Sequence, residues 1–515
     1  MTSETPAVAA PPKSSATRRQ IRGSSLMIVG RFLSLGLNFL VHILIVRYLS
    51  ESDYGAFAYA ISLVTLGETV VTLGLDRAVT RFIPIYDEQK DYGRLFGTLI
   101  MVFGTVLTLG LGLLLIFWAF PGFISERIVT DEQALGLMTI MIFLSPVQAL
   151  DTLFNGLFTV FSSPKAIFFR KYVVGPGLRL VAVGLLILTR SNVEFLAFGY
   201  LMAGVFIIVV FGFILFHMLR SNNYFQHLNI REIRIPAKAI LAFTVPLLAS
   251  DLLYTVMGTI DAILLEQYHG TEAVGAFRAV LPMARLNQVV LASFALLYTP
   301  AAARMFARQD REGINDLYWQ NAIWTAVVSF PIFALTFSLA QPVTTTLLEE
   351  RYADSAIIMA LLSLGYYFDA ALGQNGLTLK VLGKIRYIVA VYIGAAILSV
   401  IFNLMFIPTY GALGAGIGTA LTLVVFNIMK QLGLLFGTGI NLFDLRYRSI
   451  YIVVAIAAAG LLVVQIVLAP PFIVSLILAM LVSIVVLRIN RGALRVEETF
   501  PELLRIPGVR WLLAE

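Results

Sequence analysis

Long apolar segments recur along almost the whole chain, and they restrict its fold more than any other feature. Runs of predominantly apolar residues follow one another from near Ser24 to near Leu487, and each is long enough to cross the ~30 Å hydrocarbon layer of a bilayer as a helix. Hydrophobic residues make up 59% of the 515 positions and charged residues 13%, whereas soluble domains are about one-quarter charged. A membrane β-barrel is excluded, because its strands are short and alternate apolar with polar residues. The sequence therefore predicts an all-α integral membrane protein.

Charge clusters and Pro/Gly-rich turns divide the apolar sequence into about fourteen expected transmembrane helices. These lie near residues 24–46, 54–76, 94–120, 134–160, 167–189, 194–219, 238–266, 273–300, 316–340, 355–379, 386–408, 412–436, 448–468 and 471–488. With the amino terminus inside, most of the 37 basic residues, Arg170 and Lys430 among them, fall in inner segments. The outer segments hold Arg47, Arg127, Arg190, Arg278 and Arg351. The positive-inside rule then predicts a multi-pass protein of the cytoplasmic (inner) membrane with both termini cytoplasmic.

The chain also contains an internal repeat. A shift of 220 residues places Gly55-Ala56-Phe57 on Gly275-Ala276-Phe277 and Asn155-Gly156-Leu157 on Asn375-Gly376-Leu377. Six expected helices separate the copies, so the copies point the same way and are related by an axis along the membrane normal. We expect two six-helix lobes around a central cavity, followed by two extra helices. The expected parts are a disordered cytoplasmic tail (1–22), an N-lobe (23–235), a C-lobe (236–440), the two extra helices (441–490) and a cytoplasmic or interfacial tail (491–515).

Ionisable side chains within the expected spans are the candidate functional residues, because charge at bilayer depth is costly. At helical spacing, one face of the first span carries Arg31, Ser34, Asn38 and His42, and one face of the seventh carries Asp251, Tyr254, Gly258 and Asp261. The 220-residue shift places Arg31 on Asp251, so both faces are predicted to line one cavity. Further charges in the spans are Glu68, Asp151, Arg179, Asp369 and the ladder formed by Arg278 and Arg285.

Two interpretations remain open for these charges. Arg31 with Asp251, or Arg179 with Asp151, could form buried ion pairs that orient helices without adding stability. Alternatively the acids bind a coupling ion, while Arg31 and Arg285 bind an anionic substrate, since arginine suits phosphate geometry and stays charged. The sequence favours the substrate role for these two arginines.

Motifs for catalysis and cofactor binding are absent from the sequence. There are no cysteines and no GxxxxGK[ST], HExxH or GxSxG motif. The Gly-rich run at 411–418 begins an expected membrane helix, where small residues serve close helix packing. The net charge of +7 arises from bases that flank spans, so no nucleic-acid partner is expected. We expect no enzyme activity and no cofactor apart from a coupling H⁺ or Na⁺.

Three segments resemble a known family. Residues 47–57 (RYLSESDYGAF) and 74–78 (GLDRA) are similar to the opening of the polysaccharide-transporter or oligosaccharide flippase (Wzx-like) family. Residues 403–415 (NLMFIPTYGALGA) resemble that family's junction between spans eleven and twelve. The family is a branch of the multidrug/oligosaccharidyl-lipid/polysaccharide exporter superfamily. No residue marks the lipid II flippase branch.

The resemblance implies a function. Such proteins pass a polyprenyl-pyrophosphate-linked oligosaccharide from the inner to the outer leaflet by alternating access, for polysaccharide biosynthesis. Family arginines in spans one and eight hold the pyrophosphate, which maps to Arg31 and Arg285. We expect Arg278 and Asn38 to assist substrate binding, and we assign ion coupling to Glu68, Asp251, Asp261 and Asp369. The expected partners are this lipid-linked substrate, membrane lipids and polysaccharide polymerase machinery.

Two other functions compete with this interpretation. A cation or drug antiporter of the same superfamily would need an acid-dominated aromatic cavity, and the arginines expected here would repel cations. A polysaccharide polymerase or ligase of similar topology would carry catalytic residues in a large outer loop, whereas the outer connections here are short.

Overall fold

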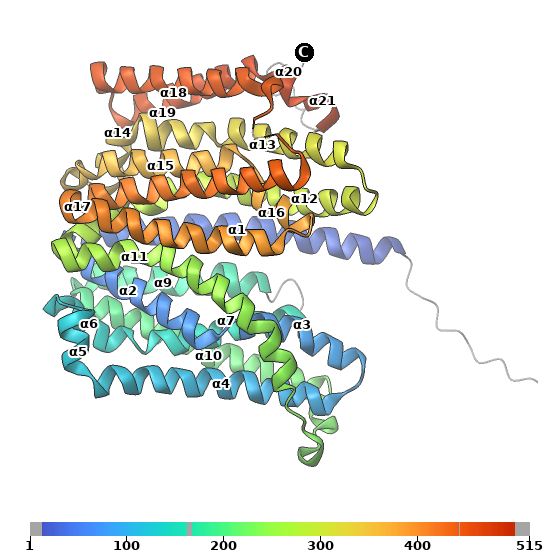
Figure 1. Cartoon of the computed structure of the whole chain (residues 1–515). Helices are drawn as coiled ribbons and strands as arrows, with labels where there is room; N and C mark the ends of the chain where they lie inside the picture. The colour runs from blue at the N-terminus through green and yellow to red at the C-terminus, as the bar shows by residue number, and fades with distance from the viewer. Residues whose placement is uncertain (1–12, 162–166, 442, 500–515) are drawn as a thin grey trace, which may run out of the picture. The chain divides into compact units, whose positions relative to one another are not determined.

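The computed structural model describes residues 13–161, 167–441 and 443–499. Throughout these ranges every regular element is a helix, which confirms the predicted fold class (Figure 1). Twelve helices in these ranges are long and apolar enough to cross a membrane, or 13 if the bent pair Glu132–Met141 and Leu144–Phe161 forms one span. The count of fourteen is therefore not confirmed and stays a prediction.

The helices follow one another with short connections. In chain order the longer ones are α1 (Lys13–Tyr48), α2 (Glu51–Thr72), α3 (Leu75–Glu88), α4 (Tyr92–Ala119), α6 (Glu132–Met141), α7 (Leu144–Phe161), α9 (Gly175–Thr189), α10 (Val193–Ser221), α11 (Ala237–Ala284), α12 (Asn287–Ala307), α13 (Arg311–Phe333), α14 (Ala340–Leu348), α15 (Ser355–Ala371), α17 (Ile385–Thr438), α18 (Arg448–Leu468) and α19 (Phe472–Ile489). The shorter ones are α5 (Pro121–Arg127), α16 (Asn375–Val381), α20 (Arg491–Leu494) and α21 (Val496–Thr499), with π-helical segments at Phe169–Val174 and Ala334–Ser338. Because α1 begins at Lys13, it includes part of the segment expected as a tail.

Helix α17 holds two expected spans, 386–408 and 412–436. Its 54 residues would extend ~80 Å if straight, far more than a bilayer. Gly411 breaks the helix with φ 54° and ψ −130°. A Cβ on Gly418 would lie 3.0 Å from Oδ1 of Asn403, although fifteen residues of straight helix would separate them by ~22 Å. The chain therefore reverses at Gly411, and α17 doubles back on itself in Figure 1.

The chain forms two compact units. Unit 1 contains the described residues within 13–48, 67–120 and 137–248, and unit 2 contains those within 49–66, 121–136 and 249–499. The lobes expected from the sequence are defined by the internal repeat, whereas these units are defined by compactness. The lobe limits therefore stay a prediction.

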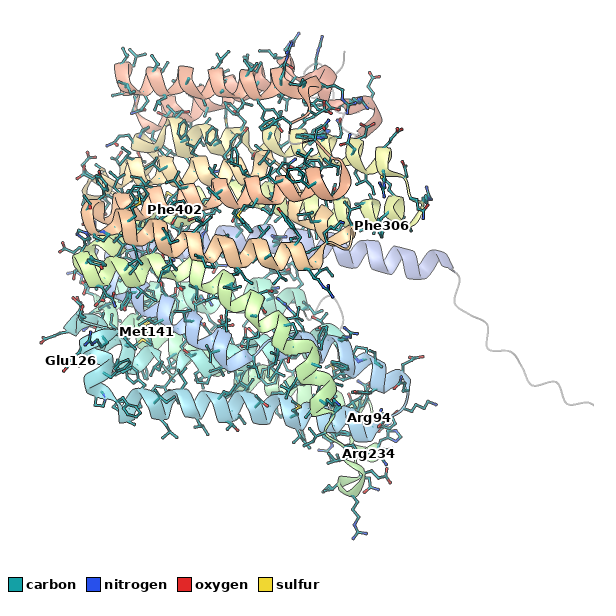
Figure 2. All side chains as sticks on the ribbon, in the orientation of Figure 1. Arg94, Glu126, Met141, Arg234, Phe306 and Phe402 are labelled. Carbon is teal, nitrogen blue, oxygen red and sulfur yellow. The ribbon has the colours of Figure 1, made fainter. Side chains whose placement is uncertain are left out.

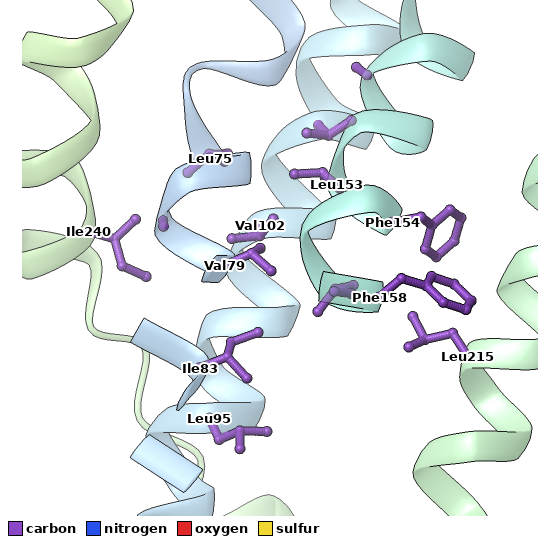
Figure 3. Close-up of a cluster of buried hydrophobic side chains, with 14 of the residues drawn as sticks. Leu75, Val79, Ile83, Leu95, Val102, Leu153, Phe154, Phe158, Leu215 and Ile240 are labelled. Carbon is purple, nitrogen blue, oxygen red and sulfur yellow. The ribbon is translucent and has the colours of Figure 1, made fainter. Parts of the chain in front are cut away.

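The core of unit 1 forms where α3 packs against α4 and α7. Leu75, Val79 and Ile83 recur at helical spacing and are all fully buried, so one face of α3 enters the core. They belong to a cluster with side chains of α4, α7, α10 and α11 (Figure 3). On α4, Leu111 and Leu115 are instead 60% and 68% exposed. A bilayer would cover such apolar surface.

The core of unit 2 surrounds α13. Tyr318, Trp319 and Phe330 on this helix are fully buried, and a second cluster joins α13 to apolar side chains of α15, α18 and α19. The Ser338 hydroxyl also donates to the carbonyl of Ala458 on α18 at 2.8 Å. The two helices that follow the repeat, α18 and α19, therefore pack within unit 2 against α13 and α15.

A carboxylate joins the 121–136 segment to α11. Glu266 is 2% exposed, and its Oε1 accepts hydrogen bonds from the backbone N–H of Thr130, from the Thr130 hydroxyl and from the backbone N–H of Asp131, at 2.7 to 2.9 Å. Asp131 also caps α6 by accepting from the N–H of Ala134 at 2.7 Å. These bonds attach the start of α6 to α11.

The first half of α2 contacts α11 reciprocally. A Cβ on Gly55 would lie 1.9 Å from the carbonyl oxygen of Thr271, and a Cβ on Gly275 would lie 2.6 Å from the carbonyl oxygen of Glu51. Since Glu51 and Thr271 are also 220 residues apart, the two contacts are exchanged by the repeat. Reciprocal contact of this kind marks a local two-fold relation between these two segments. The geometry agrees with the repeat found in the sequence.

We expect Gly55→Ala to destabilise the protein by roughly 2 kcal/mol, within the usual range for overpacking. The added methyl group would meet the backbone of Thr271, which cannot move aside as a flexible side chain could. Gly112→Ala in α4 is the matched control, because nothing lies within 4 Å of its Cβ position. Equilibrium unfolding in mixed micelles measures the stability of both variants. Equal unfolding midpoints for the two would contradict the close contact.

Candidate substrate cavity

Unit 2 contains a polar cavity of about 390 Å³. Helices α2, α11, α12, α15 and α17 line it, and most lining side chains are polar. They are Ile61, Ser62, Thr65, Tyr254, Thr255, Met257, Gly258, Thr259, Asp261, Arg278, Arg285, Gln288, Tyr366, Ser399, Thr419, Thr422 and Leu423. Three of the predicted site residues, Asp261, Arg278 and Arg285, thus lie at one cavity. Polar walls among apolar helices suit a hydrated ligand.

Arg285 supplies the available positive charge of this cavity. Its Nε donates to the hydroxyl of Tyr366 at 2.8 Å, and its side chain is accessible from the cavity. Within the described residues it has no ion pair with a carboxylate. Since a guanidinium has five N–H donors, the two terminal nitrogens remain available for a ligand. Two such donors match the oxygens of a phosphate group.

Arg278 differs from Arg285 because it is neutralised. Its Nη2 lies 2.7 Å from Oδ1 of Asp261 and also donates to the carbonyl of Gly258 at 3.0 Å. Both side chains are largely buried. These residues were expected to act in different roles, Arg278 on the substrate and Asp261 on a coupling ion. In this conformation they bind each other, so the two-arginine ladder contributes one unneutralised cation.

Asp369 lies behind the cavity rather than at its wall. Its Oδ1 is 3.2 Å from Nζ of Lys430, and its Oδ2 accepts from Nε2 of Gln288 at 3.2 Å. Lys430 also lies over the ring of Phe426, 4.1 Å from its centroid. Because Gln288 lines the cavity, it connects the cavity wall to this buried pair.

The remaining predicted residues occupy separate positions. In unit 1, Arg31 is exposed on α1, and Asn38 donates to the carbonyl and hydroxyl oxygens of Ser34 at 2.7 and 3.1 Å. Glu68 accepts from the Thr152 hydroxyl at 2.9 Å. Asp251 lies on α11 in unit 2 and is half-buried. The expectation that Arg31 and Asp251 line the same cavity stays a prediction.

One ion pair differs from those considered from the sequence. Asp151 pairs with Arg170, at 2.5 Å, rather than with Arg179. Arg170 also donates to Oδ1 of Asn155 at 2.6 Å and is 4% exposed. Arg179 lies beside the ring of Tyr200 instead.

Arg170 and Lys430 were counted among the inner connecting segments, and that assignment is wrong for both. Each is buried within a helical bundle and paired with an acid. A signal was present, because the expected spans 167–189 and 412–436 already contained them. Tyr366 and Gln288 were not predicted as site residues, because single polar residues in apolar helices form no spacing pattern.

No group of three or more His, Cys, Asp or Glu side chains in the described ranges is arranged to hold a metal ion. The lining of the cavity offers electrostatic binding by Arg285, with hydroxyl and amide groups from Tyr366, Gln288 and the threonines around it. Such a wall can hold a phosphate beside sugar hydroxyls.

Two solved transporter structures have the same fold as this chain. A solved structure of the lipid II flippase MurJ in an inward closed conformation aligns with a TM-score of 0.70 at 15% identity, over 92% of this chain and 100% of that one. An inward-facing multidrug resistance MATE family transporter aligns with a TM-score of 0.64 at 17% identity, over 79% and 93%. The fold is that of the multidrug/oligosaccharidyl-lipid/polysaccharide exporter superfamily.

Sequence comparison then gives the family. The family model described as polysaccharide biosynthesis protein matches residues 21–306, and the MatE model matches residues 246–405. The chain belongs to the polysaccharide biosynthesis protein family. A membrane protein of Methanocaldococcus jannaschii, itself uncharacterized, is 21% identical over 78% of this chain and 81% of its own length. The capsular polysaccharide biosynthesis protein CapF of Staphylococcus aureus is 23% identical over 35% of this chain and 46% of its own length.

Proposed function

We propose that this protein moves a polyprenyl-pyrophosphate-linked oligosaccharide from the inner to the outer leaflet of the cytoplasmic membrane, for polysaccharide biosynthesis. The observation that carries the proposal is Arg285, a cavity arginine whose terminal nitrogens have no carboxylate partner among the described residues. Membership of the polysaccharide biosynthesis protein family supports this cargo. So does the likeness to MurJ, which is described as a lipid II flippase.

Moving such a headgroup across a membrane requires polar groups that replace its lost hydration, and a polar cavity provides them. A pyrophosphate and several sugars would lose their hydration in hydrocarbon, at a cost of tens of kcal/mol, unless protein groups replaced the water. Arg285, Tyr366 and Gln288 offer replacement bonds to phosphate oxygens and sugar hydroxyls. The prenyl chain stays in lipid during the transfer. With both termini cytoplasmic and the cell interior negative, outward movement of an anion is favoured by ~2.3 kcal/mol per charge per 100 mV.

We assign substrate binding to Arg31, Arg278, Arg285 and Asn38, and ion coupling to Glu68, Asp251, Asp261 and Asp369. The Asp261–Arg278 pair suggests how the two roles are connected. A proton or Na⁺ on Asp261 would release Arg278 to the cavity, raising its affinity for an anion. Loss of the ion would restore the pair and weaken substrate binding. A polysaccharide polymerase at the outer leaflet would then consume the product.

The alternative function is cation or drug antiport, which the MatE match keeps open. The two functions predict different phenotypes for a deletion strain. Loss of the flippase removes surface polysaccharide and leaves lipid-linked oligosaccharide in the inner leaflet, while drug susceptibility is unchanged. Loss of an antiporter raises drug susceptibility and leaves surface polysaccharide normal. Staining of the polysaccharide and growth-inhibition assays, with the intact gene restored as control, separate the two. The second pattern would refute the proposal.

A further inference from the structure

A second cavity lies in unit 2, among residues that neither the sequence analysis nor the proposed transport path uses. Its volume is about 760 Å³, within the range of small-molecule sites. It forms where the turn between α12 and α13 meets the turn between α16 and α17 and the end of α17. Phe306, labelled at the end of α12 in Figure 2, forms part of its wall.

Two cations from different turns enter this cavity. Arg311 begins α13 and Lys384 precedes α17, and both are exposed cavity residues. Neither side chain has a hydrogen bond or ion pair with another described residue, and none of the described residues that line the cavity is a carboxylate. Asp310, beside Arg311, is engaged in capping α13, where it accepts from the N–H of Gly313 at 2.8 Å. The positive charge in the cavity is therefore not neutralised.

The backbone holds the two cations in place. Gly437 lies beneath the Lys384 stem, and a Cβ added there would lie 3.3 Å from Cε of Lys384. A larger side chain at 437 would crowd the lysine. Gln309, which also lines the cavity, adopts the left-handed conformation with φ 59°. The chain therefore turns tightly between α12 and α13 and brings Arg311 close to the end of α12.

The other walls of the cavity are apolar, and they indicate which kind of ligand would fit. Phe306, Ile314 and Leu382 are apolar, and Phe306 is 47% exposed. The cavity also lies where the candidate spans containing α12 and α17 end, which is the level of lipid headgroups. Cationic groups beside apolar surface at this level match a lipid phosphate with its glycerol and upper acyl carbons.

We propose that this cavity binds the phosphate-bearing headgroup of an anionic membrane lipid through Arg311 and Lys384. The site is separate from the Arg285 cavity and does not depend on the proposed transport function. Bound lipid would join the α12–α13 turn to the start and end of α17. The same phosphate chemistry could be presented by a resident phospholipid or by an incoming polyprenyl pyrophosphate, and the experiment distinguishes these sources.

The test uses the full chain purified in detergent, titrated with phosphatidylglycerol or zwitterionic phosphatidylcholine and observed by native mass spectrometry. We expect R311Q/K384Q to weaken phosphatidylglycerol binding at least tenfold, because the variant loses the charge-assisted hydrogen bonds to the headgroup phosphate. Binding of phosphatidylcholine should change less than twofold. The control R304Q/K380Q removes two exposed charges near the same turns without altering the cavity wall. It should retain phosphatidylglycerol affinity within twofold.

Equal loss in the two double variants, or no preference of the unmodified protein for phosphatidylglycerol, would overturn the proposal. All four residues are exposed, so folding should be retained, and the unfolding midpoint of each variant checks this. A single Gly437→Leu variant provides a second test, since it displaces Lys384 without removing charge and should also weaken binding. Displacement of phosphatidylglycerol by equimolar undecaprenyl pyrophosphate assigns the site to incoming substrate. Persistence of bound phosphatidylglycerol assigns it to a resident phospholipid.

Discussion

Arg285→Glu should abolish export of the lipid-linked oligosaccharide while leaving the protein in the membrane. The substitution removes a cavity cation that has no carboxylate partner among the described residues, and it places an anion where the pyrophosphate would bind. Loss of two charge-assisted hydrogen bonds alone predicts a decrease of at least about 100-fold in substrate affinity, and repulsion adds to it. Surface polysaccharide in a complemented deletion strain measures the effect, with membrane abundance measured in parallel.

Three further variants sharpen this result. Arg308→Glu makes the same charge change at an exposed position outside the cavity and should export normally. Arg285→Lys keeps the charge but loses the planar pair of donors, so we expect partial export. Arg31→Glu should resemble Arg285→Glu if α1 contributes the second phosphate ligand. Normal surface polysaccharide in both charge reversals would exclude the proposed binding roles.

Lys430→Met should lower the free energy of unfolding by about 3–5 kcal/mol, because it leaves the Asp369 carboxylate buried without its cation. Asp369 is 8% exposed and Lys430 is 7% exposed, so water cannot replace the lost partner. The remaining Gln288 bond at 3.2 Å compensates only in part. Equilibrium unfolding in mixed micelles measures the change.

The matched control removes both charges. Replacing a buried pair by apolar residues of similar size is often neutral for stability, so Lys430→Met with Asp369→Leu should recover most of the loss. If the single and double variants were equally unstable, the loss would come from packing around the lysine stem and Phe426 rather than from the unpaired carboxylate. A fully stable single variant would show that the pair does not hold α15 to α17.

The sequence by itself determined the fold class and the repeat. Apolar runs of membrane-spanning length can only be satisfied as helices in lipid, and this argument needs no tertiary contact. The 220-residue repeat was visible as short identities, and the reciprocal contacts of Gly55 and Gly275 agree with it. Arg285 was also identified from sequence, since an arginine deep in an apolar span has a large solvation cost and stands out.

Only the tertiary structure decided which charges are neutralised. Arg278 and Arg285 share one helical stripe and look equivalent in the sequence, yet Asp261 pairs with Arg278, because the reversal of α11 near Gly270 brings residues 17 positions apart together. From the sequence, Arg170 and Lys430 were assigned to connecting segments, whereas in the folded chain each pairs with a carboxylate. Ion pairing depends on distances of a few ångströms between helices distant in the chain, and hydrophobic periodicity carries no information at that scale.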